Sequence, residues 1–294
     1  MIRLQKDGAE MEIALLGAEM RAYRSADGKD RLWSGDPAVW KSTAPVLFPA
    51  IGAVKDGKIS IAGKDYAVPR HGFAKFLDFE VTEQGEDFVT LTLHENVETK
   101  KTYPFDFALS VTHRFLPKGF ETRYTVENHT GRVMPFMIGG HPGFMCPMNP
   151  GERFEDYVIR FEKPETVETS LCTPDTHLIG GSQAVPLDGD GRTLSLNHAD
   201  FDRLDTFIFE GLASRSVELV HKDTGHGLRF GFDMDVLAVW SMPHKNAPYV
   251  CLEPWQGAPA RVDETGRFED KPWHVELGVG QAYTCGYRME LIEG

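Results

Sequence analysis

Cysteine is scarce in this chain of 294 residues, and the few cysteines do not cluster. They are Cys146, Cys172, Cys251 and Cys285, so no CxxC pair is present. Common structural zinc sites are built from such pairs. A chain of this length also buries enough apolar surface to fold without a disulfide framework. The cysteines therefore argue against a small domain stabilised by structural zinc and against one stabilised by disulfides.

Excess positive charge and long apolar runs are missing as well. The chain has 44 acidic and 31 basic residues, for a formal net charge of −13. Nucleic acids and anionic membranes require a cationic face, so we expect neither as the main partner, although a local basic pocket remains compatible with this total. No stretch reaches the roughly 18 apolar residues of a membrane span, and residues 1–13 lack the apolar core of a signal peptide. We therefore expect a cytoplasmic protein.

Three motifs of well-defined chemistry are also absent. The sequence contains no HExxH zinc-protease motif, no GxSxG nucleophile elbow and no GxxxxGK[ST] phosphate loop. His221 and His226 flank a predicted hairpin turn, at a spacing that matches no common metal site. The residues alone therefore give only weak support for a metal site.

Convincing helical periodicity is almost lacking, and alternation with a period of two takes its place. Residues 107–115 and 282–292 each put alternate apolar side chains on one face of a strand. Residues 236–240 form a continuous apolar run, typical of a strand buried on both faces. Residues 198–205 predict a short helix. Many short strands without a linker or repeat predict an all-β sandwich or barrel, in a single domain of residues 1–294.

Three short stretches combine an ionisable side chain with a constrained backbone. His141 follows two glycines and precedes a proline in GGHPGF. The residue before a proline is pushed into an extended conformation, and glycine permits a positive φ or a close approach to another backbone. Glu253 precedes a proline and interrupts an apolar run in VCLEPWQG, where burial would raise its pKa and suit it to proton transfer near neutral pH. His71 precedes a glycine in PRHGFAK.

Each of these residues also has an ordinary structural interpretation. A lone histidine in a β protein is more often a hydrogen-bonded polar residue than a catalyst. A glutamate beside a tryptophan is more often an ion-pair partner at the end of a strand. Taken singly, none of the three stretches identifies an activity, and only their combination in one β domain points to a site.

Five motifs, in this order and spacing, resemble those of the aldose 1-epimerase (galactose mutarotase) family, most closely its shorter bacterial branch. They are APVLFPAIG (44–52), RHGFAK (70–75), YPFDF (103–107), GGHPGF (139–144) and CLEPWQG (251–257). Together they cover nearly the whole chain. The resemblance implies one large antiparallel β-sandwich, the galactose mutarotase-like supersandwich. Such a protein binds a monosaccharide in an open cleft and needs no metal or organic cofactor.

The resemblance also assigns expected catalytic roles, position by position. Glu253 is similar to the general base that takes the proton from the anomeric hydroxyl of the sugar. His141 is similar to the general acid that protonates the ring oxygen, and His71 to a second histidine that hydrogen-bonds the sugar. The ring would open, rotate about its C1–C2 bond and close on the other face of the carbonyl. The implied enzyme is an isomerase, an aldose 1-epimerase (mutarotase).

Further residues are expected to bind the sugar. Asp205 matches the acidic residue with which the family holds sugar hydroxyls, although a capping or turn role beside the short helix fits the local sequence equally well. Trp255 and Phe73 would offer an apolar wall to the C–H face of the sugar, with core packing as the more frequent role of such residues.

The sequence departs from the family pattern at two cationic positions. Typical members carry an arginine after the FP..G motif, where this chain has Ala53, Val54 and Lys55, and Lys75 stands where HGFAR is common. Lysine lacks the bidentate fork of arginine, which puts the sugar specificity in question. Together with Arg70, these lysines open the alternative of a hexose-6-phosphate 1-epimerase, because phosphate recognition uses clustered Arg or Lys.

Two alternatives from other classes are a sugar-binding protein without turnover and a generic all-β carbohydrate-binding module. Retention of His71, His141 and Glu253 together argues against the first, since binding alone does not require an acid–base set. The length of the chain and the expected absence of a secretion signal argue against the second. The expected ligand is a monosaccharide, an aldohexose that is either free or phosphorylated, and the sequence leaves the oligomeric state open.

Overall fold

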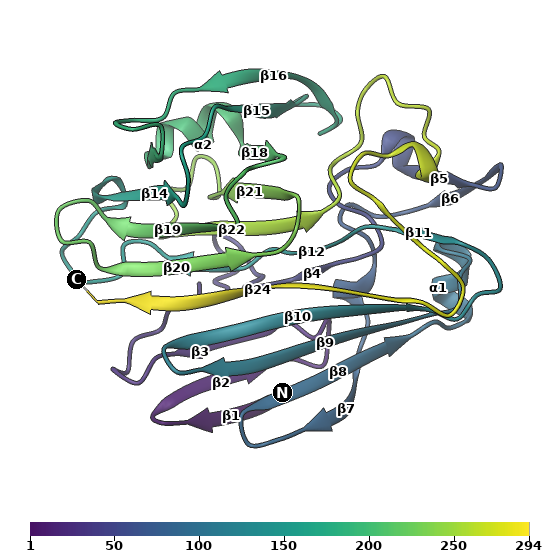
Figure 1. Ribbon diagram of the computed structural model, residues 1–294, viewed down its shortest axis with the longest axis horizontal. Coiled ribbons are helices and arrows are strands. Elements are labelled where there is room, and N and C mark those ends of the chain that lie inside the picture. The colour runs from purple at the N-terminus through teal and green to yellow at the C-terminus, as the bar shows by residue number, and fades with distance from the viewer. Residues whose placement is uncertain (294) are drawn as a thin grey trace.

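The computed structural model describes residues 1–293, whose regular structure is almost entirely antiparallel β-strand (Figure 1). The larger of two main sheets has nine strands in the order β17-β14-β19-β20-β24-β10-β9-β8-β7. In that order they span Thr193–Ser195, Tyr157–Phe161, Ser216–His221, Gly227–Phe232, Ala282–Ile292, Gly119–Asn128, Phe107–Leu116, Phe88–His94 and Glu80–Gln84.

The smaller main sheet has six strands, five of them in the order β18-β21-β22-β12-β4, while β13 also pairs with β22. The five span Thr206–Glu210, Val236–Trp240, Tyr249–Gln256, Ile138–Gly140 and Val46–Leu47, and β13 spans Gly143–Met145. The predicted buried strand at residues 236–240 is β21, in which four of five residues are buried.

Shorter elements complete the described chain. A three-stranded sheet consists of β1 (Ile2–Lys6), β2 (Ala9–Ile13) and β3 (Met20–Arg24). Three two-stranded sheets pair β5 (Lys58–Ile61) with β6 (Lys64–Ala67), β11 (Met134–Phe136) with β23 (Val275–Leu277), and β15 (Val167–Cys172) with β16 (Ile179–Val185). The helices are α1 (Val97–Thr102) and α2 (His198–Leu204), with 3₁₀ turns at Lys55–Gly57, Ala74–Phe76, Phe154–Asp156 and Phe268–Asp270.

The two main sheets pack against each other through aromatic side chains. The rings of Phe144 on β13 and Phe230 on β20 have centroids 5.6 Å apart, as do those of Phe161 on β14 and Phe209 on β18. Such pairs add to the free energy gained by burying their area. The predicted all-β sandwich is therefore confirmed.

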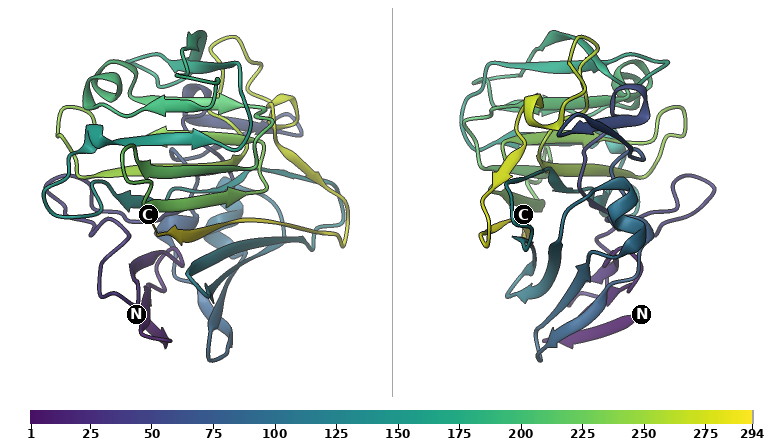
Figure 2. Two further views of the ribbon diagram at one scale, coloured as in Figure 1. Left: turned by 60° about the vertical axis from the view of Figure 1, so that its left-hand side comes forward. Right: turned by 90° about the vertical axis from the view of Figure 1, so that its right-hand side faces the viewer.

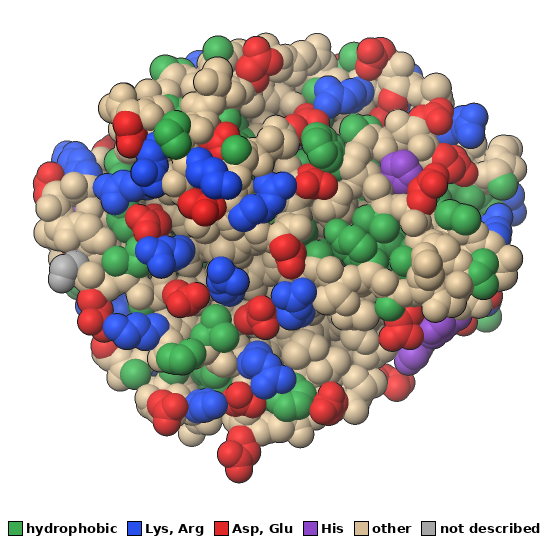
Figure 3. All heavy atoms as spheres, viewed as in Figure 1, with side chains coloured by type: hydrophobic (Ala, Val, Ile, Leu, Met, Phe, Trp, Pro, Cys, Tyr) green, Lys and Arg blue, Asp and Glu red, His purple; other side chains and the backbone are tan. Residues whose placement is uncertain are grey.

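Alternation along β9 shows why the sequence forms this layer. Every second residue from Phe107 to Phe115 is buried, as predicted, and the residues between them from Ser110 onward are partly exposed. One face of the strand therefore meets the core and the other meets solvent. The face shown in Figure 3 carries Lys and Arg side chains interspersed with Asp and Glu.

The β1–β3 sheet extends the fold at one end. Figure 2 shows it in both views beside the N-terminus, near the ends of β7–β9. Its Tyr23 packs on Phe120 of β10, with ring centroids 4.9 Å apart. Among residues 1–293, no helix is both long and apolar enough to cross a membrane.

The sequence analysis missed α1, which owes its start to a cap rather than to periodicity. The side chain of Asn96 accepts hydrogen bonds from the backbone N–H groups of Glu98 at 2.9 Å and Thr99 at 3.0 Å. The Thr99 hydroxyl in turn accepts one from the Asn96 backbone N–H at 2.8 Å, which completes a capping box. These bonds satisfy donors that a helix start otherwise leaves unpaired.

We expect Asn96→Ala to lower the free energy of unfolding by about 1 kcal/mol, the usual loss for an N-cap. Urea unfolding followed by circular dichroism measures it. Val97→Ala is the control, because Val97 is 77% exposed on the same turn, and surface changes of this kind usually stay within about 0.5 kcal/mol. Equal stability of the two variants would show that the cap contributes nothing.

Candidate functional site

A cleft of about 760 Å³ crosses the smaller main sheet. Its lining includes Leu47 of β4, His141 just after β12, Glu253 and Trp255 of β22, Trp240 of β21 and Thr206 of β18. Loop residues that include Trp40, Lys41, Arg70, His71 and Lys75 complete the lining. This volume lies in the range of pockets that bind small organic ligands.

Glu253 lies at the floor of the cleft, held there by the alternation of β22. Alternate side chains of a strand point to opposite faces, and Glu253 and Trp255 line the cleft whereas the intervening buried Leu252 and Pro254 do not. The Glu253 side chain lines the cleft although the residue is only 1% exposed. Burial raises the pKa of the Glu253 carboxyl well above its usual value, and the charge of Arg70 opposes that rise.

The two glycines before His141 are required by close packing. A Cβ on Gly139 would lie 2.7 Å from Cδ1 of Trp255, and one on Gly140 would lie 2.6 Å from the hydroxyl of Tyr124. Neither glycine has a positive φ. The backbone N–H of His141 donates to the carbonyl of Pro45 at 3.1 Å. The GGHP segment thus lets β12 lie close to its neighbours and fixes the position of His141 in the cleft lining.

The His141 ring faces Glu253 across a short gap. Nε2 of His141 lies 3.2 Å from Oε2 of Glu253, and the ring centroid lies 4.9 Å from that of Trp40 and 5.4 Å from that of Trp240. Burial, assisted by the charge of Lys75, lowers the pKa of His141 to about 3. Burial therefore favours the uncharged form of both members of the pair.

His71 is fixed by its own backbone in a left-handed conformation, with φ of 63°. Its ring Nδ1 accepts a hydrogen bond from the backbone N–H of Gly52 at 3.1 Å, and its backbone N–H donates to the Gly52 carbonyl at 2.9 Å. An Nδ1 that accepts leaves the proton on Nε2. Burial lowers the pKa of His71 well below its usual value. The ring is thus a neutral Nε2–H donor, 5.8 Å between centroids from His141.

The structure brings most of the expected binding residues to the same cleft. Asp205, Trp255, Arg70 and Lys75 all line it. Asp205 follows the last residue of α2 and has a φ of 64°. Its carboxylate accepts hydrogen bonds from the Thr206 hydroxyl at 3.0 Å and from the Trp240 indole, at the longer distance of 3.4 Å. Asp205 therefore both forms the turn that ends α2 and lines the cleft.

Two of the expected binding residues lie elsewhere, and their placement in the cleft was wrong. Lys55 begins a 3₁₀ turn, and its Nζ donates to the backbone carbonyl of Glu264 at 2.7 Å. Phe73 is buried among core aromatics, with its ring centroid 6.0 Å from that of Phe48. Neither side chain lines the cleft. Phe73 follows the general rule that a large aromatic in a β protein packs in the core.

Among the lining residues that the sequence analysis missed are Trp40, Trp240 and Lys41. Trp240 is the last residue of the apolar run that forms β21, and in the structure it is the one partly exposed residue of that strand. A tryptophan at the end of an apolar run is only a weak sequence signal of a site. Trp40 and Lys41 are adjacent in a loop with no apolar periodicity. A tryptophan beside a lysine in such a loop was the only local hint.

One cluster within residues 1–293 has donor atoms of the kinds that hold metals. Ligand atoms of His141, Cys251 and Glu253 lie within 4.8 Å of one another. A thiolate, not a thiol, is the ligand in such sites. Burial raises the pKa of the Cys251 thiol well above its usual value. The sulfur is thus held in the form that binds metals poorly.

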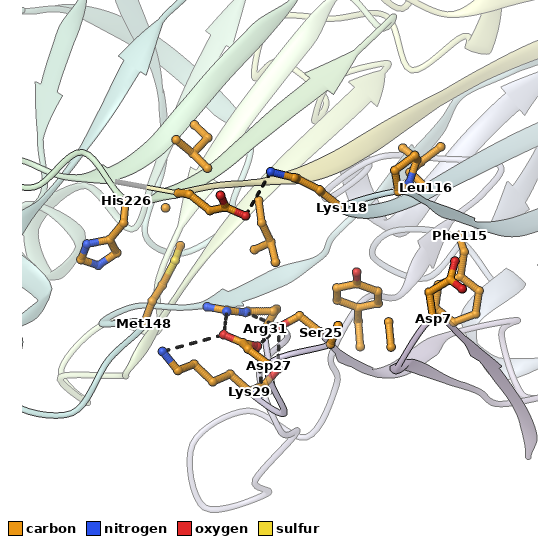
Figure 4. A pocket seen from close by; sticks show the side chains of 18 of the residues that line it. Asp7, Ser25, Asp27, Lys29, Arg31, Phe115, Leu116, Lys118, Met148 and His226 are labelled. Atoms are coloured by element: carbon orange, nitrogen blue, oxygen red, sulfur yellow. Dashed lines mark hydrogen bonds and ion pairs between the residues drawn. The ribbon is translucent and has the colours of Figure 1, made fainter.

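A second hollow of about 560 Å³ lies between the β1–β3 sheet and the ends of β9 and β24 (Figure 4). Its cations are bound by neighbouring protein groups. Arg31 contacts Asp27 at 2.6 Å, Lys118 contacts Glu293 at 3.0 Å, and Lys29 donates to the side-chain oxygen of Asn149 at 2.7 Å. None of the expected site residues lines this hollow.

Comparison with known proteins agrees with the geometry. The family model for aldose 1-epimerase matches residues 1–290. The chromosomal protein LacX of Lactococcus lactis subsp. lactis is 32% identical over 278 residues, which are 92% of each chain. The crystal structure of a galactose mutarotase related enzyme from Lactobacillus acidophilus has a TM-score of 0.92 and 29% identity, covering 99% of this chain and 97% of that one.

A galactose mutarotase-like protein from Lactobacillus casei has a TM-score of 0.91 and 29% identity, covering 99% of this chain and 100% of its own. The matches therefore extend over the strands that carry the cleft as well as the rest of the sandwich. The chain belongs to the aldose 1-epimerase family.

Proposed function

We propose that the protein is an isomerase that interconverts the α and β anomers of a monosaccharide. One observation carries the proposal: a carboxyl and an imidazole, Glu253 and His141, lie 3.2 Å apart at the buried floor of an open cleft. Opening a hemiacetal ring needs a base at the anomeric hydroxyl and an acid at the ring oxygen. A carboxyl and an imidazole this close together can reach both oxygens of one sugar ring and so supply that pair.

Glu253 and His141 together hold the one proton that this chemistry needs. One proton on the Glu253 carboxyl with a neutral His141 ring is equivalent in charge to a carboxylate with an imidazolium. Transfer of that proton across the 3.2 Å gap therefore produces the reactive form without any change in net charge. The polar hydroxyls of a bound sugar stabilise the charged form, which burial alone disfavours.

The reaction then proceeds by two proton transfers. The Glu253 carboxylate takes the proton of the anomeric hydroxyl, and the His141 imidazolium gives its proton to the ring oxygen. The bond between C1 and the ring oxygen breaks as the C1 carbonyl forms, which yields the open-chain aldehyde. Rotation about C1–C2 presents the other carbonyl face, and both transfers reverse. No oxidant, reductant or other reactant enters this balance.

The remaining residues hold the sugar. His71 is proposed to donate its Nε2–H to a sugar oxygen, because Nδ1 is already bound to Gly52. Asp205 is proposed to accept hydrogen bonds from sugar hydroxyls. Trp40, Trp240 and Trp255 give the cleft aromatic surfaces, and these suit the C–H faces of a pyranose ring.

Exchange spectroscopy by NMR tests the proposal. A panel of free and phosphorylated aldohexoses is equilibrated, and the rate between the α and β anomeric signals is measured with and without the protein. We expect acceleration of at least one sugar well above its spontaneous rate, in proportion to protein concentration. A protein that binds a sugar tightly but accelerates none would be a binding protein on this scaffold, and the proposed activity would be wrong.

A further inference from the structure

The cleft contains cations that no protein carboxylate neutralises. Arg70, Lys75 and Lys41 all line it, and none of them forms an ion pair within residues 1–293. The fourth cation of the lining, Arg21, differs because it contacts Glu19 at 2.9 Å. In the second hollow, by contrast, Arg31 and Lys118 contact carboxylates. Unpaired cations therefore gather at the cleft, in a protein whose formal net charge is −13.

These cations lie at a different depth from the acid–base pair. Arg70 and Lys41 are exposed residues of the cleft lining, and Lys75 is partly buried. Glu253, by contrast, lies at the buried floor. The charge of Arg70 acts on Lys75, His71, His141 and Glu253 alike, so it lies within electrostatic range of all four. A ligand whose reacting end reaches the floor would place its far end among these cations.

We propose that the substrate is a phosphorylated aldose whose phosphate is bound at the mouth of the cleft by Arg70, Lys75 and Lys41. The inference rests on the proposed function, because it takes the reacting hemiacetal to lie at Glu253 and His141. A phosphate dianion accepts charge-assisted hydrogen bonds from several cations at once, whereas a neutral hydroxyl leaves their charges uncompensated. A hexose phosphorylated at C6 has the required shape, with its anion at the end of the molecule remote from C1.

The protonation of Lys75 should make the binding of phosphate depend on pH. Burial and the charge of Arg70 lower the pKa of Lys75 to about 8. The lysine is therefore cationic below that pH and neutral above it, while a phosphate monoester is a dianion above about pH 6. The charged or titratable groups around Lys75 in the cleft are Arg70, Lys41, Arg21, Glu19, Glu253, His71 and His141. Preference for the phosphorylated sugar should be greatest between about pH 6 and 8.

The first experiment compares kcat/KM within matched series: glucose, glucose 6-phosphate and glucuronate, and the corresponding galactose compounds. We expect the 6-phosphate to exceed the free sugar by about tenfold or more at pH 7, the scale of a charge-assisted contact. Added salt should reduce that ratio by screening. Equal values for free and phosphorylated sugar would overturn this inference and leave the isomerase proposal intact, whereas acceleration of no sugar would overturn both. Equal values for the uronate and the phosphate would show that any anion suffices and would overturn the assignment to phosphate.

Variants of Lys75 give the second experiment. Lys75→Met should lower the ratio of phosphorylated to free sugar by about tenfold, and Lys75→Arg should keep the ratio above pH 8, where the wild type loses it. Lys118→Met is the control, because Lys118 contacts Glu293 in the second hollow, and its ratio should match the wild type. A Lys75→Met ratio equal to that of the wild type would overturn the role of Lys75.

A binding measurement separates recognition from turnover. Glucose 6-phosphate and galactose 6-phosphate are titrated calorimetrically into Glu253→Gln, with and without Lys75→Met. We expect the second substitution to weaken binding of the phosphate but to have a smaller effect on glucose or galactose. An equal loss for the phosphorylated and free sugars would show that Lys75 only shapes the cleft and would overturn its role in binding phosphate.

Discussion

Replacing Glu253 with Gln should slow anomer exchange by about 10²-fold or more, the lower end of what a positioned base supplies. The amide has the shape of the protonated carboxyl and keeps its capacity for hydrogen bonding, but it cannot take a proton from the anomeric hydroxyl. Burial already favours the uncharged carboxyl, so the substitution should change the free energy of unfolding little. NMR exchange spectroscopy measures the rate, and urea unfolding measures the stability.

Glu218→Gln is the matched control for this experiment. Glu218 contacts Arg229 at 2.9 Å on the nine-stranded sheet, away from the cleft. Its substitution should leave the exchange rate unchanged. A Glu253→Gln variant as fast as this control would show that Glu253 is not the base, even if the wild type proves to be a mutarotase.

Replacing His141 with Asn should also slow exchange by about 10²-fold or more, because the ring oxygen loses its proton donor. Asparagine keeps a polar group after Gly140 and before Pro142, so the extended segment should be retained. At least one of the two single variants should still bind sugar, which calorimetry measures. The change is then one of chemistry and not of folding.

His129→Asn serves as the control for His141, because His129 is half-exposed and contacts Glu127 at 3.0 Å on the surface. The double variant Glu253→Gln, His141→Asn supplies a further criterion. Its loss should be much smaller than the product of the two single losses, since groups that act as one unit are not additive. Fully multiplicative losses would contradict a shared proton between the two side chains.

The strands were predictable because their constraint is local. In β9, burial of one face requires an apolar residue at every second position, and Phe107 to Phe115 meet that requirement in the sequence itself. The same holds for the continuous apolar run of β21. Helix α1 escaped prediction because its signal is a single pair, Asn96 and Thr99, in an otherwise polar segment.

The site was predictable where the backbone constrains a side chain. The proline after His141 and the glycines before it mark a fixed position, and Glu253 stands out as a charge within an apolar strand. Lys55 was misplaced because its distance along the chain from the motif before it does not determine the path of the loop. In the structure its side chain donates to the backbone carbonyl of Glu264 instead. Trp40 reaches His141 only through the fold, since 101 positions separate residue 40 from residue 141.

The dispersed origin of the cleft has a kinetic consequence. Its walls come from positions as far apart in the chain as Leu16 and Trp255, and they include residues of β4, β22, β21 and β18. Contacts of such long range form late, because closing long loops costs entropy before the contacts repay it. A partly folded chain therefore possesses strands without possessing a site. Recovered activity during refolding would report completion of the whole smaller sheet, a stricter criterion than recovered β-structure.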